Sequence, residues 1–286
     1  METTLKSVKT VLIGPERPTA LIGERINPTG KKRLSAALQA GDLSIVKEEA
    51  LAQAAAGADV LDVNVGAAGV DQVDLLPKAV RLVLETVDLP VAIDSPSVEA
   101  LAAALALHRE LAPQGKPLVN SVNGEEKRLQ EVLPLVKEYG AAVIGLCMDD
   151  DGIPMSADRR VAVAAKIVAR AEALGIPRQD LLIDCLALTV GADSNAGKVT
   201  LEAIRRVRDE LGVNMTLGAS NVSFGLPERE VVNAAFLSMT IQAGVNCAIV
   251  DAAKVRPAIL ATDLLLGRDA YGGRYIKGYR QRKAAG

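Results

Sequence analysis

The runs ALIGERIN at residues 20–27, DVLDVNVG at 59–66 and PVAIDS at 90–95 open a series of eight short apolar segments that decides the fold of this chain. The other five are PLVNSV at 117–122, AAVIGLCMD at 141–149, LLIDCL at 181–186, MTLGASNVS at 215–223 and CAIVDA at 247–252. Near-continuous Val, Ile and Leu of this kind are typical of parallel strands that are buried on both faces. The sequence therefore predicts eight parallel β-strands.

Longer segments with helical periodicity separate these runs, with apolar residues at i, i+3 and i+4 and charges between them. The expected helices are 34–56, 75–87, 98–111, 125–139, 158–174, 200–211, 228–242 and 256–266. A glycine, which favours the positive φ that often ends a helix, precedes several of the next strands, at Gly57, Gly140, Gly175, Gly212 and Gly244. This alternation predicts an α/β fold, and eight units predict a single closed (β/α)8 TIM barrel. The alternative is an open doubly wound sheet, but no G-x-G-x-x-G follows the first strand.

The length of 286 residues suits one barrel, which typically needs about 250 residues. We expect an N-terminal extension over 1–18, a barrel over 19–267 and a basic C-terminal tail over 268–286. The tail holds four arginines, two lysines and three tyrosines. It is expected to be frayed, and the alternative is a docking surface for an acidic partner protein.

The composition excludes several classes of protein. A net charge of −2 shows no bias towards nucleic acid, and 2% aromatic residues with no Trp argue against stacking of single strands. No secretory signal and no apolar run of about 18 residues is present, so we expect no membrane segment. Three widely spaced cysteines form neither a disulfide framework nor a zinc site, and the cytoplasm is the expected compartment.

Polar side chains stand at the carboxyl end of every predicted strand, where the chemistry of such barrels is found. In chain order the strand-end residues, all polar except Met148, are Glu24, Arg25, Asn27, Asp62, Asn64, Asp94, Asn120, Asn123, Met148, Asp149, Asp184, Ser220, Asn221, Ser223 and Asp251. Asp and Asn are depleted inside strands, so their placement needs a reason. Capping of the following helices explains one or two of them, and Ser95-Pro96-Ser97 resembles a helix start. Helix capping does not explain the polar residues at all eight strand ends, and this favours a polar ligand site.

The chemistry of the set favours a flat heterocycle over a metal or a phosphate. No strand-end lysine is evident for a magnesium–enolate site, and the glycine-containing turn at 191–198 is a weak phosphate candidate. A pterin presents a ring N–H beside an exocyclic amino group, and a carboxylate accepts both. Asp94, Asn120 and Asp184, on three separate strands, match this requirement.

Six of these segments together resemble a known family. They are GERIN at 23–27, LDVNVG at 61–66, AIDS at 92–95, VNSVN at 119–123, LLID at 181–184 and GASNVSFGLP at 218–227. In this order they are similar to the methyltransferases that move a methyl group between methyltetrahydrofolate and a corrinoid protein. That group includes the partner of the corrinoid iron–sulfur protein, the methyltransferases of O-demethylase and betaine systems, and the folate module of cobalamin-dependent methionine synthase.

The resemblance implies roles for individual residues. Asp94, Asn120 and Asp184 would hold the pterin ring, and Asn221 would hydrogen-bond near N5, the atom that bears the methyl group. A looser match places Arg229 near the site. The residues that would line its floor or orient the others are Glu24, Asn27, Asp62 and Asn64. The resemblance implies no metal bound by the chain itself, because cobalamin would arrive on the partner protein at an open barrel mouth.

Dihydropteroate synthase shares the barrel and the Asp/Asn/Asp set, and it is the nearest rival. Two departures count against it. That family carries a lysine where this chain has Asn221, and its first loop reads N-V-T-P-D-S-F where this chain has INPTGKKR at 26–33. A folate-binding subunit without activity is the other alternative. Phe224 matches the methionine synthase form of the motif, so the identity of the corrinoid partner stays open. The direction of methyl transfer stays open as well.

A methyl group on a tertiary amine leaves only if positive charge or a proton develops at the nitrogen. We therefore expect Asn221 to position and polarise N5, while the proton comes from solvent through a network with the carboxylates. The single histidine, His108, is expected on the surface of a helix, away from the site. Barrels of this kind are often dimers, so a homodimer is expected.

Overall fold

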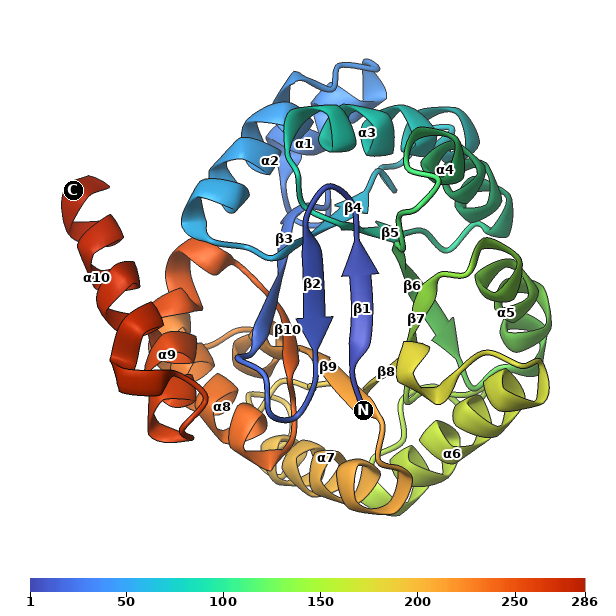
Figure 1. The fold of residues 1–286 in the computed structure, drawn as a ribbon. Coiled ribbons are helices and arrows are strands. Elements are labelled where there is room, and N and C mark those ends of the chain that lie inside the picture. The colour runs from blue at the N-terminus through green and yellow to red at the C-terminus, as the bar shows by residue number, and fades with distance from the viewer. Residues whose placement is uncertain (286) are drawn as a thin grey trace.

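The computed structural model describes residues 1–285 and is a closed barrel of eight parallel strands (Figure 1). The strands in order are β3 (Ala20–Ile26), β4 (Val60–Asn64), β5 (Val91–Asp94), β6 (Leu118–Asn123), β7 (Ala142–Leu146), β8 (Leu181–Asp184), β9 (Asn214–Gly218) and β10 (Cys247–Val250). Parallel pairing of β10 with β3 closes the ring, so the open doubly wound sheet is excluded. All eight predicted strands are present.

Helices surround the barrel and follow the strands in the predicted alternation. They are α1 (Lys32–Gln39), α2 (Ser44–Ala56), α3 (Gln72–Thr86), α4 (Val98–Leu111), α5 (Glu126–Tyr139), α6 (Ala157–Ala173), α7 (Ala196–Leu211), α8 (Arg229–Ala243) and α9 (Ala252–Leu265). Ser97 caps α4 by accepting a hydrogen bond from the Ala100 amide, as its sequence suggested. Within residues 1–285, no helix is long and apolar enough to cross a membrane.

Two predicted elements have the wrong extent. The single helix expected over 34–56 is two helices, because Gly41 takes a φ of 70° and turns the chain between α1 and α2. The strand expected over 215–223 ends at Gly218, and the next five residues form the short 3-10 helix η2 (Ala219–Ser223). A second such turn, η1 (Arg178–Asp180), leads into β8. The glycine prediction is confirmed at Gly57, which ends α2 with a φ of 91°.

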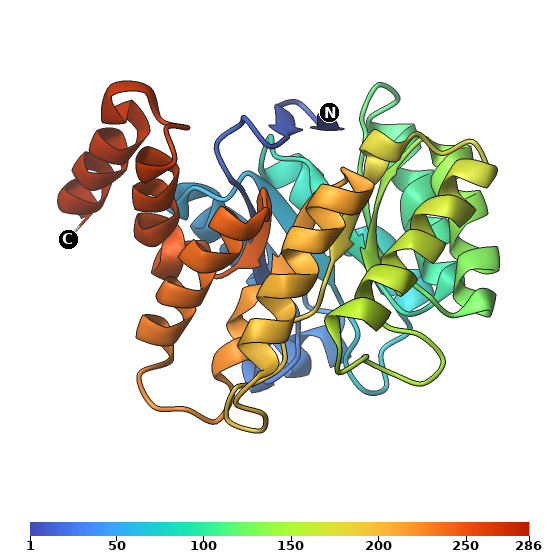
Figure 2. The same ribbon diagram turned by 90° about the horizontal axis from the view of Figure 1, so that it is seen from below.

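An N-terminal hairpin of β1 (Thr3–Lys6) and β2 (Thr10–Ile13) lies across the end of the barrel where the strands begin (Figures 1 and 2). Leu5 and Ile13 are fully buried and pack on the inward side chains of the lower barrel. These inward residues are all small or apolar, and they are Ala20, Ile22, Val60, Ala92, Leu118, Ala142, Ile144, Leu182 and Cys247. The hairpin therefore plugs the end of the barrel where the strands begin, and Asn214 of β9 ties it there by donating to Thr3 Oγ1 and to the Ile13 carbonyl. The strand-end polar residues are left at the opposite end.

Truncation of the plug should destabilise the whole barrel. Leu5→Ala is expected to lower the free energy of unfolding by about 2–5 kcal/mol, because the cavity it leaves is enclosed by barrel side chains. Leu12 is the matched control, since it lies on the same hairpin and is 36% exposed. Leu12→Ala should change stability by less than about 1 kcal/mol. Equal losses for the two variants in urea titrations would contradict the plug.

The C-terminal segment is not frayed, contrary to expectation. After the turn η3 (Ala270–Gly272), helix α10 (Gly273–Ala285) packs against α9 outside the ring of helices (Figure 1). Asp269 starts α10 by accepting hydrogen bonds from the amides of Arg274 and Tyr275. The fully buried Asp263 of α9 pairs with Arg274 at 3.3 Å and accepts from the Thr19 amide. Gly286, the last residue of the expected tail, lies outside the described residues.

His108 is buried, and its expected surface position is wrong. It shares the inner face of α4 with Ala104 and Leu105, and only 2% of the residue is exposed. Burial lowers the pKa of His108 to about 4, so the imidazole is neutral. Its Nε2 atom has no hydrogen-bond partner within the described chain. His108 is therefore a packing residue of the helical layer.

Candidate functional site

The ends of β4, β5 and β6 bring three predicted site residues into one row. Asn64 pairs in register with Asp94, and Asp94 pairs in register with Asn120. The Asn64 amide donates to Asp94 Oδ2 at 2.9 Å, and the Asn120 amide donates to Asp62 Oδ1 at 3.0 Å from the layer below. Asp94 and Asn120 also line a cavity of about 350 Å³ that opens between the loops after β5 and β6. The structure thus assembles four of the predicted residues into one hydrogen-bonded group.

Asp62 and Asp94 share a proton in this group. Burial is the main cause that raises the pKa of Asp94 to about 6, against the stabilising hydrogen bonds from Asn64 and Asp62. Burial, followed by the charge of Asp94, raises the pKa of Asp62 well above its usual range. Two carboxyl groups this close do not both ionise. At neutral pH Asp62 is therefore a neutral acid that donates to Asp94, and Asp94 is an anion that faces the cavity.

Asp184 is the second buried anion of the site. It is 4% exposed and ends β8, and burial raises its pKa to about 6. Its Oδ1 accepts a hydrogen bond from the Leu186 amide at 2.7 Å, and its Oδ2 accepts from the Gly218 amide at 3.2 Å. These two bonds hold the carboxylate in one orientation between β8 and β9. Its oxygens retain lone pairs for a ligand.

Asn221 lies in η2, beyond the end of β9. It is exposed, and its side chain makes no hydrogen bond within residues 1–285. Its backbone carbonyl accepts from the Phe224 amide at 3.3 Å, which helps to hold the turn. The side-chain amide is therefore free to contact a ligand at the barrel mouth, by which we mean the carboxyl ends of β3–β10.

Glu24 and Arg229 lie together in a cavity of about 530 Å³ beside η2. Burial is the main cause that raises the pKa of Glu24, and Ser220 Oγ donates to its Oε1 at 3.4 Å. Arg229 donates to the Ser220 carbonyl at 2.8 Å and to Ser223 Oγ at 3.0 Å, and its guanidinium lies 4.5 Å from the centre of the Phe224 ring. Arg229 therefore holds the segment that carries Asn221.

Two basic residues that the sequence analysis missed shape the mouth. Lys31 lies in the loop after β3, and its ammonium donates to the carbonyls of Glu24, Arg25 and Asn27 at 3.0–3.2 Å. Burial lowers the pKa of Lys31. Arg128 donates to three carbonyls, those of Ser95 and Pro96 in the loop after β5 and that of Ser121 in β6. The feature of the sequence that could have marked Arg128 is its place in the first turn of α5, where the helix dipole disfavours a cation.

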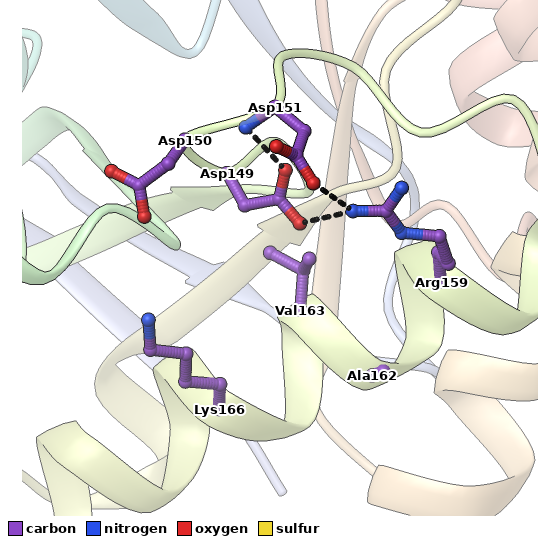
Figure 3. Close-up of a pocket in the computed structure, with 7 residues that line it drawn as sticks. All are labelled: Asp149, Asp150, Asp151, Arg159, Ala162, Val163 and Lys166. Carbon is purple, nitrogen blue, oxygen red and sulfur yellow. Dashed lines mark hydrogen bonds and ion pairs between the residues drawn. The ribbon is translucent and has the colours of Figure 1, made fainter.

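The loop after β7 forms a separate hollow of about 430 Å³ (Figure 3). Asp149 and Asp151 both turn towards Arg159, which donates to them at 3.2 and 2.8 Å, while Asp150 points away (Figure 3). Asp149 also accepts from the Asp151 amide at 3.1 Å. Lys166 donates to the Gly124 carbonyl across the hollow. The strand-end Asp149 therefore serves the conformation of its own loop and does not join the Asp94 group.

The sequence pattern of the family described as pterin binding enzyme matches residues 23–251, which contain all of the predicted site residues. The chain therefore belongs to the pterin-binding enzymes. It is 32% identical over 274 residues to the methylcorrinoid:tetrahydrofolate methyltransferase of Eubacterium limosum, a match that covers 92% of this chain and 97% of the relative. Together these findings make the chain a methyltransferase of that family.

The chain is also similar to part of two larger proteins. It is 34% identical over 271 residues to the methionine synthase of Mycobacterium leprae and 35% identical over 251 residues to that of Mycobacterium tuberculosis. These matches cover 90% and 83% of this chain but only 22% and 21% of the relatives. This chain thus spans about a fifth of each methionine synthase.

Solved structures share the fold. A dihydropteroate synthase of Xanthomonas albilineans with 4-aminobenzoic acid matches 92% of this chain and 98% of its own, with a TM-score of 0.69 and 21% identity. The enzyme of Yersinia pestis matches 93% of this chain and all of its own, with a TM-score of 0.67 and 16% identity. At this identity the likeness concerns the fold alone.

Proposed function

We propose that the protein transfers a methyl group between N5 of methyltetrahydrofolate and the cobalt of a corrinoid held by a partner protein. The observation that carries the proposal is the pair of oriented buried anions, Asp94 and Asp184, with the free amide of Asn221 at the same barrel mouth. The family membership and the Eubacterium limosum relative support the same reaction. A lysine in place of Asn221, as in dihydropteroate synthases, would have favoured synthesis of the pterin conjugate.

The pterin ring is recognised through its N–H donors. Its ring N–H and exocyclic amino group need anionic acceptors in a dry site, which Asp94 and Asp184 provide. The Asn120 amide uses its N–H₂ group on Asp62, so its oxygen remains available to accept from the ring. Hydrogen bonds of this kind to charged groups contribute about 1.5–3 kcal/mol each.

Methyl transfer from N5 requires that N5 gain a proton as the methyl group leaves. In the forward direction the bond from N5 to the methyl carbon breaks, a bond from that carbon to Co(I) forms, and Co(I) becomes methyl-Co(III). The electron pair of the broken bond stays on N5, which gains a proton. Asn221 donates a hydrogen bond to N5 and stabilises the developing lone pair more in the transition state than in the ground state.

The proton reaches N5 from solvent by way of the buried carboxyl groups. Glu24 is suited to this step because burial raises its pKa, so it holds a proton more readily than an exposed glutamate. Ser220 hydrogen-bonds Glu24 and immediately precedes Asn221 in the chain. Together they form a polar path that ends beside the side chain proposed to contact N5.

Transfer is measured by mixing the protein with methyltetrahydrofolate and cob(I)alamin without oxygen and following the loss of cob(I)alamin absorbance. Loss of absorbance together with formation of tetrahydrofolate supports the proposal. Tight folate binding with no turnover on free or protein-bound cobalamin would favour the non-catalytic folate-binding subunit instead. Condensation of a pterin with 4-aminobenzoate would favour the synthase.

Folate binding should weaken as the pH falls. Asp94 and Asp184 each have a pKa of about 6, so both lose their charge below that value and stop accepting two N–H donors. The dissociation constant of methyltetrahydrofolate should be flat above about pH 7 and rise about tenfold or more by pH 5. Calorimetric titrations across this range measure the effect.

The stability of the unliganded protein provides the control, because these two groups act on it in the opposite direction. Their folded pKa of about 6 lies above the unfolded value, so the folded state binds more protons. Their contribution to stability therefore increases as the pH falls from about 6 to about 4. If affinity is lost only where thermal melts show unfolding, the carboxylates are not the cause.

A further inference from the structure

Arg160 is a buried cation without an anion in contact. It lies in the first turn of α6, on the inner face with Ala157 and Val161, and it is 1% exposed. Within residues 1–285, no carboxylate lies within ion-pair distance of its guanidinium. A buried charge of this kind is destabilising unless its surroundings compensate it. Its partners therefore indicate why the position is arginine.

Those partners lie mainly on the loop that follows Asp184. One guanidinium nitrogen of Arg160 donates to the carbonyl of Cys185 at 2.9 Å and to that of Leu186 at 2.7 Å. The same nitrogen donates to Thr200 Oγ1 of α7 at 3.0 Å, and Nε donates to the Pro154 carbonyl at 2.8 Å. A single side chain from α6 thus ties the end of β8 to two neighbouring segments.

The loop needs this support because Leu186 has a φ of 60°, which side chains rarely adopt. In this conformation the Leu186 carbonyl faces Arg160 and Thr200, while its amide donates to Asp184 Oδ1 at 2.7 Å. The two polar groups of one residue therefore connect the arginine to the carboxylate. Release of the carbonyl would let the amide turn away from Asp184.

The positive charge of Arg160 also complements the negative charge of Asp184. From β9, Asp184 receives only the Gly218 amide, and α7 contributes the uncharged Thr200 hydroxyl to the loop. The Cys147 thiol at the end of β7 and the Cys185 thiol after β8 are the other titratable groups here. A hydrogen bond between these thiols and burial raise the pKa of Cys185 well above its usual range, so it carries no charge. Burial raises the pKa of Asp184, and the hydrogen bonds from the Leu186 and Gly218 amides and then the charge of Arg160 lower it.

We infer that Arg160 is a positioning residue for pterin binding: it fixes the Cys185–Leu186 loop that orients the Asp184 carboxylate, and its charge balances that carboxylate across the loop. This inference rests on the proposed role of Asp184 in holding the pterin ring. Arg160 itself does not contact the ligand. Its effect is transmitted through the Leu186 peptide and through the electric field at Asp184.

The test is the pH dependence of methyltetrahydrofolate binding, measured by calorimetry with wild type, Arg160→Met, Arg160→Lys and Thr200→Val. Arg160→Met should raise the pH midpoint of binding by about one unit or more, so its loss of affinity is at least about threefold greater near pH 6.5 than near pH 9. Arg160→Lys keeps the charge and should keep the wild-type midpoint, with weaker binding at every pH. Thr200→Val removes a neutral contact of Arg160 and the hydroxyl that donates to the Leu186 carbonyl, so it should weaken binding at every pH and leave the midpoint unchanged.

A role in folding alone gives a different result. It predicts the same loss of affinity at every pH and an unmoved midpoint in Arg160→Met, and that outcome overturns the inference. Should Arg160→Met not fold, Arg160→Met/Asp184→Asn should fold, because removal of both buried charges removes the imbalance. Failure of both variants to fold also overturns it. Absence of folate binding in the wild type would instead contradict the proposed function, so the two failures are distinguishable.

Discussion

Asp94→Asn is expected to weaken methyltetrahydrofolate binding by about 100-fold or more, the largest effect on binding of any single change at the site. The substitution removes the anion that accepts the ring donors and places an amide N–H₂ group against them. Loss of two charge-assisted hydrogen bonds weakens binding by about 3–6 kcal/mol. The net loss is smaller, because the asparagine no longer has the free-energy cost of a buried charge. Equilibrium dialysis or calorimetry at about pH 8 measures the change, where the wild-type carboxylate is ionised.

Asp62→Asn is the matched control, because it alters the neighbouring carboxyl of the same pair. Asp62 is a neutral acid that accepts from Asn120 and donates to Asp94, and an asparagine amide can do both. Folate affinity should therefore stay within about threefold of wild type. Equal losses in the two variants would mean that the proton of the pair is not on Asp62.

Asn221→Ala is expected to slow methyl transfer by about 100-fold while changing folate affinity only a few-fold. The reason is that its amide acts on N5, where charge changes during the reaction, and not on the ring edge held by Asp94 and Asp184. Removal of one preorganised donor of this kind typically lowers the rate by about 10²–10³. Single-turnover stopped-flow measurements of cob(I)alamin absorbance separate this rate from binding.

Asn195→Ala provides the comparison for that variant. Asn195 precedes α7 in the loop after β8, is exposed, and its side chain makes no cap hydrogen bond. The rate of this control should match wild type. An Asn221→Ala protein with an unchanged rate and an unchanged pH profile would exclude the role assigned to the amide.

The fold was largely predictable because its signals are local. Each strand is a short apolar run, and each helix repeats apolar positions every three to four residues, so element type follows from the residues themselves. The errors occur where the signal is weak. A single glycine, Gly41, divides the helix expected over 34–56, and the basic end becomes helix α10 because Asp269 and the buried Asp263 bind it.

The site was predictable in part. Asp94, Asn120 and Asp184 stood out because polar residues at strand ends contradict strand propensity. Arg128 and Arg160 did not, because an arginine in a helix usually faces water. For Arg128 the available signal was its place in the first turn of α5, where a cation is disfavoured, and for Arg160 it was the place on the inner face of α6.

The sequence by itself determined the eight βα units, the order of the strand-end residues and the family to which the chain belongs. Only the tertiary structure decided how those residues act: that Asp62 holds a proton for Asp94, that Leu186 directs Asp184, and that η2 leaves Asn221 free. The physical reason is that the pKa and orientation of a buried group depend on desolvation and on neighbours distant in the chain. Asp62 and Asn120 are 58 residues apart in the sequence, and only the curved sheet of the barrel brings them into contact across β5.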